Sequence, residues 1–179
     1  MGETLTDNKN FLSPLGFRLL LHRAPNVEYF CQSAQLPSMT MNPAIQSSPL
    51  LNIPRAGDKI TYEPLSLKFR VSEDMDNYLE LYNWIRGLGH PESLNQYKEL
   101  YDAGDTTSPI RISDHGHGLV SDGTIIVLSS NANANVRLNF ENLFPVELSP
   151  LQFDVTQESI EYMECDVSFN YTLFTVGDL

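Results

Sequence analysis

The 179-residue chain has only two cysteines, few basic residues and no long apolar run. Cys31 and Cys165 stand outside any cluster with metal-ligand spacing, and two reduced thiols are favoured over a disulfide between them. No apolar stretch approaches the roughly 18 residues of a membrane-spanning helix, so no membrane partner is expected. Residues 1–14 form a polar lead-in that lacks the pattern of a signal peptide.

Basic residues are scarce relative to acidic ones. Lysine and arginine total 11 against 23 aspartates and glutamates, which gives a net charge of −12. From Glu141 onward the sequence contains acids and no lysine or arginine. Contacts to phosphate need lysine and arginine, so the chain is not expected to grip nucleic acid, although nucleic acid can pass beside it. The plainer interpretation of the acidity is solubility.

The sequence also lacks a readable catalytic constellation. It has no G-x-S-x-G elbow, no phosphate-binding glycine loop and no H-E-x-x-H pair. His115 and His117 follow Asp114 at a spacing that zinc can use, but no third ligand stands at a suitable distance, so no metal site is predicted. Glu164 and Asp166 are interpreted as solvated charges rather than as an acid pair. The sequence therefore predicts no enzyme and no cofactor.

The clearest pattern is a strand that runs into a helix between residues 63 and 89. Leu65, Leu67, Phe69 and Val71 alternate with polar residues, which predicts a strand with one buried face. Ser72 and the acids after it are typical of a helix start. Apolar residues then recur at helical spacing from residue 75 to residue 88. This helix is expected to cover one side of a β structure.

Most other regular segments are predicted to be strands. Two hairpins are predicted, one pairing residues 17–21 with 28–35 and one pairing 125–128 with 136–141, the latter preceded by a turn at 121–123. Further alternation predicts strands at 59–62 and 151–155, and residues 93–101 suggest a second short helix. The result is a single domain over 1–179 with seven to nine strands. We expect a mainly β (α+β) fold, an antiparallel β-sandwich or barrel of two sheets with one flanking α-helix.

A proline-rich stretch at residues 40–55 differs in composition from the segments around it. Its three prolines disfavour a central strand, while its apolar residues disfavour disorder. Those apolar residues are Ile45, Leu50, Leu51 and Ile53. Two interpretations stay open: an extended arm that docks on a neighbouring subunit, or a loop folded back on its own domain.

The last long alternation covers residues 163–173. Its apolar face runs from Met163 to Leu173. Its polar face carries Glu164, Asp166, Ser168, Asn170 and Thr172. Unbroken alternation predicts a central strand with one wet face.

The motifs together resemble the tail-tube proteins and baseplate tube-initiators of contractile-tailed, T-even-like bacteriophages. The similarity covers most of residues 15–176. It is carried by short motifs in a shared order: Tyr29–Pro37, Ala56–Asp58, Leu65–Trp84, Ile126–Ser129, Leu143–Pro145, Leu151–Asp154 and Asp166–Tyr171. The enlarged segment Glu92–Ser121 departs from the family pattern.

The resemblance implies the tail-tube fold and a structural role. Six copies would close into a ring by joining sheet edges, rings would stack, and the phage genome would leave through the lumen without specific binding. It implies a subunit found in the virion tail and assembled in the host cytoplasm, with tail sheath or baseplate proteins as further partners. Glu164, Asp166, Ser168 and Asn170 are the lumen-lining candidates.

In the same interpretation, the candidates for an inter-subunit arm are Ile45, Leu50, Leu51 and Ile53. Which ring the chain builds stays open between the main tube, the baseplate initiator and a head-proximal ring. A more distant alternative is a monomeric β-sandwich binding module, such as a carbohydrate binder.

Overall fold

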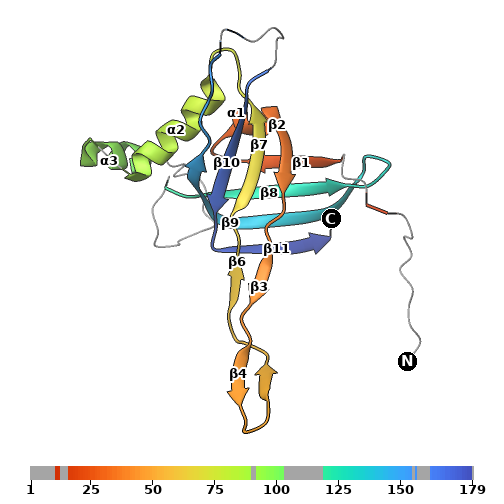
Figure 1. Ribbon diagram of the computed structural model, residues 1–179. Coiled ribbons are helices and arrows are strands. Elements are labelled where there is room, and N and C mark those ends of the chain that lie inside the picture. The colour runs from red at the N-terminus through yellow and green to blue at the C-terminus, as the bar shows by residue number, and fades with distance from the viewer. Residues whose placement is uncertain are drawn as a thin grey trace.

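The computed structural model describes residues 11–12, 16–89, 92–102, 119–154, 156 and 162–178. In this part of the chain, two antiparallel layers cross one another and helices flank them (Figure 1). The first layer has the order β1 (Phe17–Leu21), β8 (Ser121–Leu128), β9 (Ala134–Leu148) and β11 (Leu173–Asp178). The second continues from the end of β9 to β10 (Glu164–Asn170), β7 (Leu65–Arg70) and β2 (Cys31–Gln35).

Strand β9 belongs to both layers. Its first part pairs with β8 and β11, and its last residues pair with β10. Between these parts Asn142 has a φ of 54°, a left-handed conformation that asparagine tolerates better than most residues. The Asn142 N–H donates to Asp122 Oδ1 at 3.2 Å, and the Asn142 side chain donates to Thr172 Oγ1 at 3.2 Å. The strand thus changes layers at a hydrogen-bonded corner.

The core lies between the two layers. Inward residues of β7 and β10 alternate with outward ones, and the inward members are buried: Leu65, Leu67, Phe69, Cys165, Val167 and Phe169. Helix α2 (Asp76–Gly89) covers this core with Leu81 and Trp84. The Trp84 ring centroid lies 6.1 Å from that of Phe169, and its indole N–H donates to the Leu119 carbonyl at 2.9 Å. The predicted strand-helix unit is confirmed.

The connection from β7 to α2 is built around one buried polar side chain. Asn77 is 0% exposed, and its Oδ1 accepts from the Ser72 N–H at 3.2 Å and from the Tyr78 N–H at 2.9 Å. Its Nδ2 donates to the Arg70 carbonyl at 2.7 Å. Ser72 Oγ in turn accepts the Asp76 N–H at 3.1 Å. The helix begins at Asp76, four residues after the predicted cap, because Met75 has a φ of 58° that interrupts the helical backbone. Asn77 therefore locks the end of the strand to the first turn of the helix.

The predicted hairpin between 17–21 and 28–35 is wrong. Residues Pro25–Phe30 form a short helix, α1, and only Cys31–Gln35 are a strand. Strand β1 pairs with β8 and β2 pairs with β7, so the two strands lie in different layers. Proline is favoured at the first helical position, and Val27 is buried against the core. The predicted hairpin of β8 and β9 is confirmed.

Three other strand expectations need correction. The alternation at 163–173 breaks at Tyr171 and Thr172, so β10 and β11 are separate strands and β9 is the longest. Residues 121–123 are part of β8 and not a turn. Residues 151–154 are not in a strand, and Phe153 is exposed. The second helix is present as α3 (Leu94–Asp102). Most of the enlarged segment Glu92–Ser121 lies outside the described residues.

The proline-rich stretch forms a two-stranded ribbon that projects away from the layers (Figure 1). Its base pairs β3 (Met39–Met41) with β6 (Ile60–Tyr62), and its tip pairs β4 (Ala44–Ser47) with β5 (Asn52–Arg55). Proline is acceptable here because each strand of a two-stranded ribbon has a free edge. The ribbon is called the arm below.

Replacing Asn77 with alanine is expected to destabilise the fold by roughly 2–3 kcal/mol, because it leaves the Arg70 carbonyl and the Ser72 N–H without their buried partner. Denaturant unfolding followed by tryptophan fluorescence measures the loss. Asn83→Ala, on the exposed side of the same helix, is the matched control. Equal stability of the two variants would contradict the role given to Asn77.

Candidate functional site in the arm and the charged sheet face

The arm presents apolar side chains to solvent. Leu50 is 98% exposed, Ile45 69%, Leu51 67% and Ile53 43%. A soluble protein rarely leaves such a group uncovered without an interaction to make. The structure therefore gives no support to a loop folded back on its own domain. The docking of these four residues on a neighbour stays a prediction.

Local contacts give the arm a defined shape. At the tip, Ser48 Oγ donates to the Leu51 carbonyl at 2.7 Å and accepts the Leu51 N–H at 3.2 Å. Below the tip, Arg55 Nε donates to Gln46 Oε1 at 2.5 Å across the two strands. Where the base meets the tip, a Cβ on Gly57 would lie 2.0 Å from the Asn42 carbonyl oxygen, so only glycine fits there.

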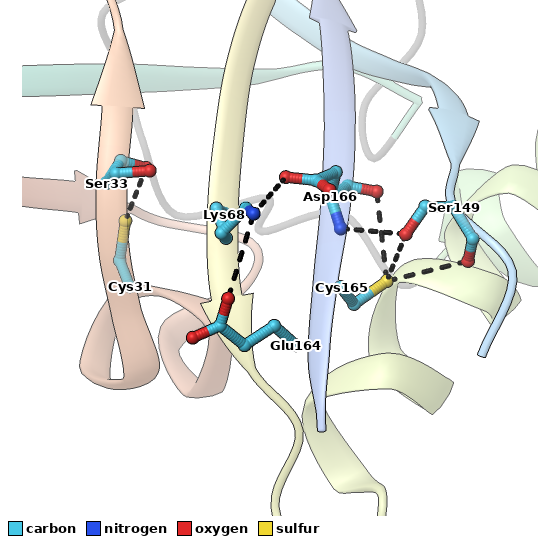
Figure 2. Close-up of polar contacts among 7 residues, drawn as sticks. All are labelled: Cys31, Ser33, Lys68, Ser149, Glu164, Cys165 and Asp166. Carbon is cyan, nitrogen blue, oxygen red and sulfur yellow. Dashed lines mark hydrogen bonds and ion pairs between the residues drawn. The ribbon is translucent and has the colours of Figure 1, made fainter. Parts of the chain in front are cut away.

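The second candidate surface is the outer face of the β7–β10 layer, here called the charged face. Lys68 on β7 lies between two carboxylates of β10, as Figure 2 shows. Its Nζ is 3.7 Å from a Glu164 oxygen and 3.8 Å from an Asp166 oxygen. All three side chains are partly exposed to solvent, so each pair contributes at most about 1 kcal/mol to stability.

The cross-strand register extends this face. Glu164 stands opposite Arg70, and Ser168 stands between Ser66 on one side and Glu147 on the other. Residues directly opposite in an antiparallel pair point to the same face. The face therefore carries two cations and three carboxylates rather than acids alone.

The predicted polar side of β10 is confirmed for three of its four candidates: Glu164, Asp166 and Asn170 are exposed, while Ser168 is half-buried. Their placement beside a channel is not tested by the single chain. Lys68 and Arg70 are members that the sequence did not reveal, although both were expected to point away from the core. The missing information was that β7 pairs with β10 rather than with another strand.

Both cysteines are free thiols, as expected. Both stand opposite Phe69, from the strands on its two sides, and two intervening strand spacings exceed the reach of a disulfide. Burial raises the pKa of Cys31 to about 11, and burial also raises the pKa of Cys165. Cys165 contacts Ser149, whose Oγ accepts the Asp166 N–H at 2.8 Å (Figure 2).

The described residues hold no group of three possible metal ligands. His115 and His117 lie outside them. Among the described helices, none is long and apolar enough to cross a membrane.

The profile of a family described as phage tail tube protein matches residues 8–177. The chain thus belongs to the phage tail tube protein family, which confirms the resemblance stated from its motifs.

Among curated proteins, the chain is similar to the tail tube terminator protein of Enterobacteria phage T4. The two are 24% identical over 123 residues, which is 68% of this chain and 60% of the phage T4 protein. The alignment therefore spans less than two thirds of that relative.

Solved structures of contractile systems share the fold. The tube-terminating cap of the anti-feeding prophage has a TM-score of 0.64 and 13% identity, covering 98% of this chain and 97% of that one. The sheath/tube terminator of an extracellular contractile injection system has a TM-score of 0.60 and 13% identity, covering 95% and 99%. A chain of the anti-feeding prophage baseplate also reaches 0.60 with 13% identity, covering 94% and 96%. At this identity the likeness shows the fold alone.

Because its apolar side chains are exposed, the tip of the arm is expected to be dispensable for folding. Replacing residues 43–54 with a Gly-Ser-Gly turn should change the free energy of unfolding by less than about 1 kcal/mol. Circular dichroism and denaturant unfolding make the comparison with the unmodified chain. A variant that no longer folds would show that the arm belongs to its own core.

Proposed function

We propose that the chain is a subunit of the ring that ends the tube of a contractile phage tail. The observation that carries the proposal is the sequence match to a tail tube terminator over 123 residues. Membership in the tail tube family and the fold shared with two terminator structures support it. The chain is then a component of the virion tail, assembled in the host cytoplasm.

In this proposal six copies close into a ring through their strand edges, as the family resemblance implies. In the described part of the chain, β1 and β11 are the outer strands of one layer and β2 is an outer strand of the other. Outer strands present backbone N–H and C=O groups that lack partners in a single copy. A closed ring pairs such edges with those of the next copy, so no edge is left over.

The arm is the contact to the next subunit or ring. Its four exposed apolar side chains would leave water on docking, and each fully buried leucine or isoleucine contributes about 1.5–3 kcal/mol. Its ribbon form gives this apolar surface a fixed shape, which reduces the ordering cost of association. Tail sheath or baseplate proteins are the further partners in this proposal.

The charged face is proposed to line the channel, with Glu164, Asp166, Ser168 and Asn170 toward the passing DNA. Three carboxylates against two cations keep this wall weakly repulsive to phosphate. A passing duplex carries about one charge per 1.7 Å, so even weak attraction would sum over a long contact. No specific binding of DNA is proposed.

The alternatives are a subunit of the main tube or of the baseplate initiator ring. Similarity of fold does not separate these alternatives from the terminator. A chain of the anti-feeding prophage baseplate has a TM-score of 0.60, and a chain of a sheath-tube complex has a TM-score of 0.61. The curated relative favours the terminator. Membership in the tail tube family favours a tube role over the monomeric binding-module hypothesis.

The copy number of the chain in purified virions tests the proposal. A closed terminal ring predicts on the order of six copies, counted by quantitative mass spectrometry against a capsid protein. A main-tube subunit would give many stacked rings and a proportionally larger count.

A second experiment adds the purified chain to a growing tube, and elongation of the tube should then stop. A chain that is incorporated along the whole tube would contradict a terminating role.

Reversing the charge on the channel face should slow genome delivery. Glu164→Lys with Asp166→Lys leaves one carboxylate facing four cations, while assembly should persist because both positions are exposed. DNA release from virions is expected to slow and to recover partly in 1 M salt, where the screening length falls to about 3 Å.

Glu73→Lys with Asp74→Lys makes the same charge change on the exposed turn before α2 and serves as the control. Normal ejection by the Glu164/Asp166 variant would place this face away from the DNA.

A further inference from the structure

Four aromatic rings gather where the arm meets the two layers. They come from three places in the chain and are Tyr62, Phe140, Tyr171 and Phe174. The ring centroid of Tyr62 lies 5.4 Å from that of Phe174 and 5.9 Å from that of Tyr171. Phe140 lies 5.1 Å from Tyr171 and 5.6 Å from Phe174. These are the distances of favourable aromatic pairs. Tyr62, on β6, is the member that belongs to the arm.

A hydrogen bond ties the same cluster to the backbone of the arm. The Tyr171 hydroxyl donates to the Glu63 carbonyl at 2.9 Å. The Glu63 N–H donates to the Ser38 carbonyl at 3.1 Å, and these two residues flank the paired base strands β6 and β3. Burial is the main cause that raises the pKa of Tyr171 to about 12, and the nearby Tyr62 is the second cause. The hydroxyl therefore keeps its proton at neutral pH and can donate this hydrogen bond.

The backbone of the arm continues the paired strands β2 and β7 in the same register, across the hydrogen bond from Glu63 to Ser38. Its four strands contact chiefly one another, and they form sheets separate from the two layers. A two-stranded ribbon by itself has little stability in water, so contacts at its base bear on its direction relative to the body. Beside this backbone continuation, the rings and the Tyr171 hydrogen bond are the side-chain contacts that hold the base of the arm against the layers. Only Phe140 of the four is fully buried, so the cluster is set at the margin of the core.

We propose that Tyr62 and Tyr171 are positioning residues that set the direction of the arm, so that its apolar tip is aimed before a neighbour arrives. The inference rests on the proposed function, in which the arm docks on the next subunit or ring. A pre-aimed arm loses less conformational freedom on docking than a hinged one, which strengthens association without adding any contact.

In the isolated chain, the distance between the arm tip and the body shows directly whether the arm has a fixed direction. Spin labels on Leu50→Cys and Asn83→Cys, in a Cys31→Ser background, allow the distance distribution to be measured by pulsed electron paramagnetic resonance. Cys165 can stay, because its buried thiol does not label readily. The unmodified cluster should give one narrow distribution.

Tyr62→Leu and Tyr171→Leu should each broaden the distribution, and Tyr171→Phe should broaden it less because the ring remains. Assembly onto tube ends should weaken by about tenfold for the two leucine variants. Tyr82→Leu, on the exposed side of α2, is the matched control and should change neither result. Because Tyr62 lies on the arm side, its replacement tests the cluster even if Tyr171→Leu fails to fold.

A narrow, unchanged distribution in Tyr62→Leu would overturn the inference. A broad distribution with undiminished assembly would overturn the role of direction in docking. The arm-tip variant Leu50→Ser with Leu51→Ser tests the proposed function separately. If that variant assembles normally, arm docking is wrong whatever the distances show.

Discussion

The structure depends on the corner at which β9 leaves one layer and enters the other. Since one strand hydrogen-bonds in both layers, the layers cannot slide apart, and Phe140 and Leu143 are enclosed between them. The link between β10 and β11 turns beside this corner, where the Thr172 N–H donates to the Glu141 carbonyl at 2.9 Å. The two places at which the chain changes layers, within β9 and between β10 and β11, are thereby fixed to one another by Asn142 and Thr172.

The two candidate surfaces follow from this corner. On one side of it, β10 and β7 are held in the register that brings Lys68 between Glu164 and Asp166. On the other side, Tyr171 and Phe174 flank the turn and hold the base of the arm. The same constraint thus orients a weakly charged sheet face and a projecting apolar ribbon, which are the two candidate surfaces.

Much of the fold could be predicted from the sequence because it depends on local patterns. Neighbouring residues determine periodicity, which predicts the alternation of Leu65–Val71, the helical spacing after Met75 and the β8–β9 pairing. The misplaced hairpin at α1 and the break at Tyr171 depend on which layer each strand joins, and that is a tertiary choice. For the site, the proline-rich setting of Ile45 and Leu50 was compatible with an exposed arm and with a loop folded back on its own domain, and the Lys68 pairing required the strand order.

The most direct measurement is a cryo-EM map of the tail end that contains this chain. We expect Leu50 and Leu51 to be buried against a neighbouring subunit and Glu164 and Asp166 to face the channel. We also expect density for the arm in the direction seen in the single chain (Figure 1). Arms that stand free in solvent, or a charged face turned to the outside of the ring, would contradict these expectations.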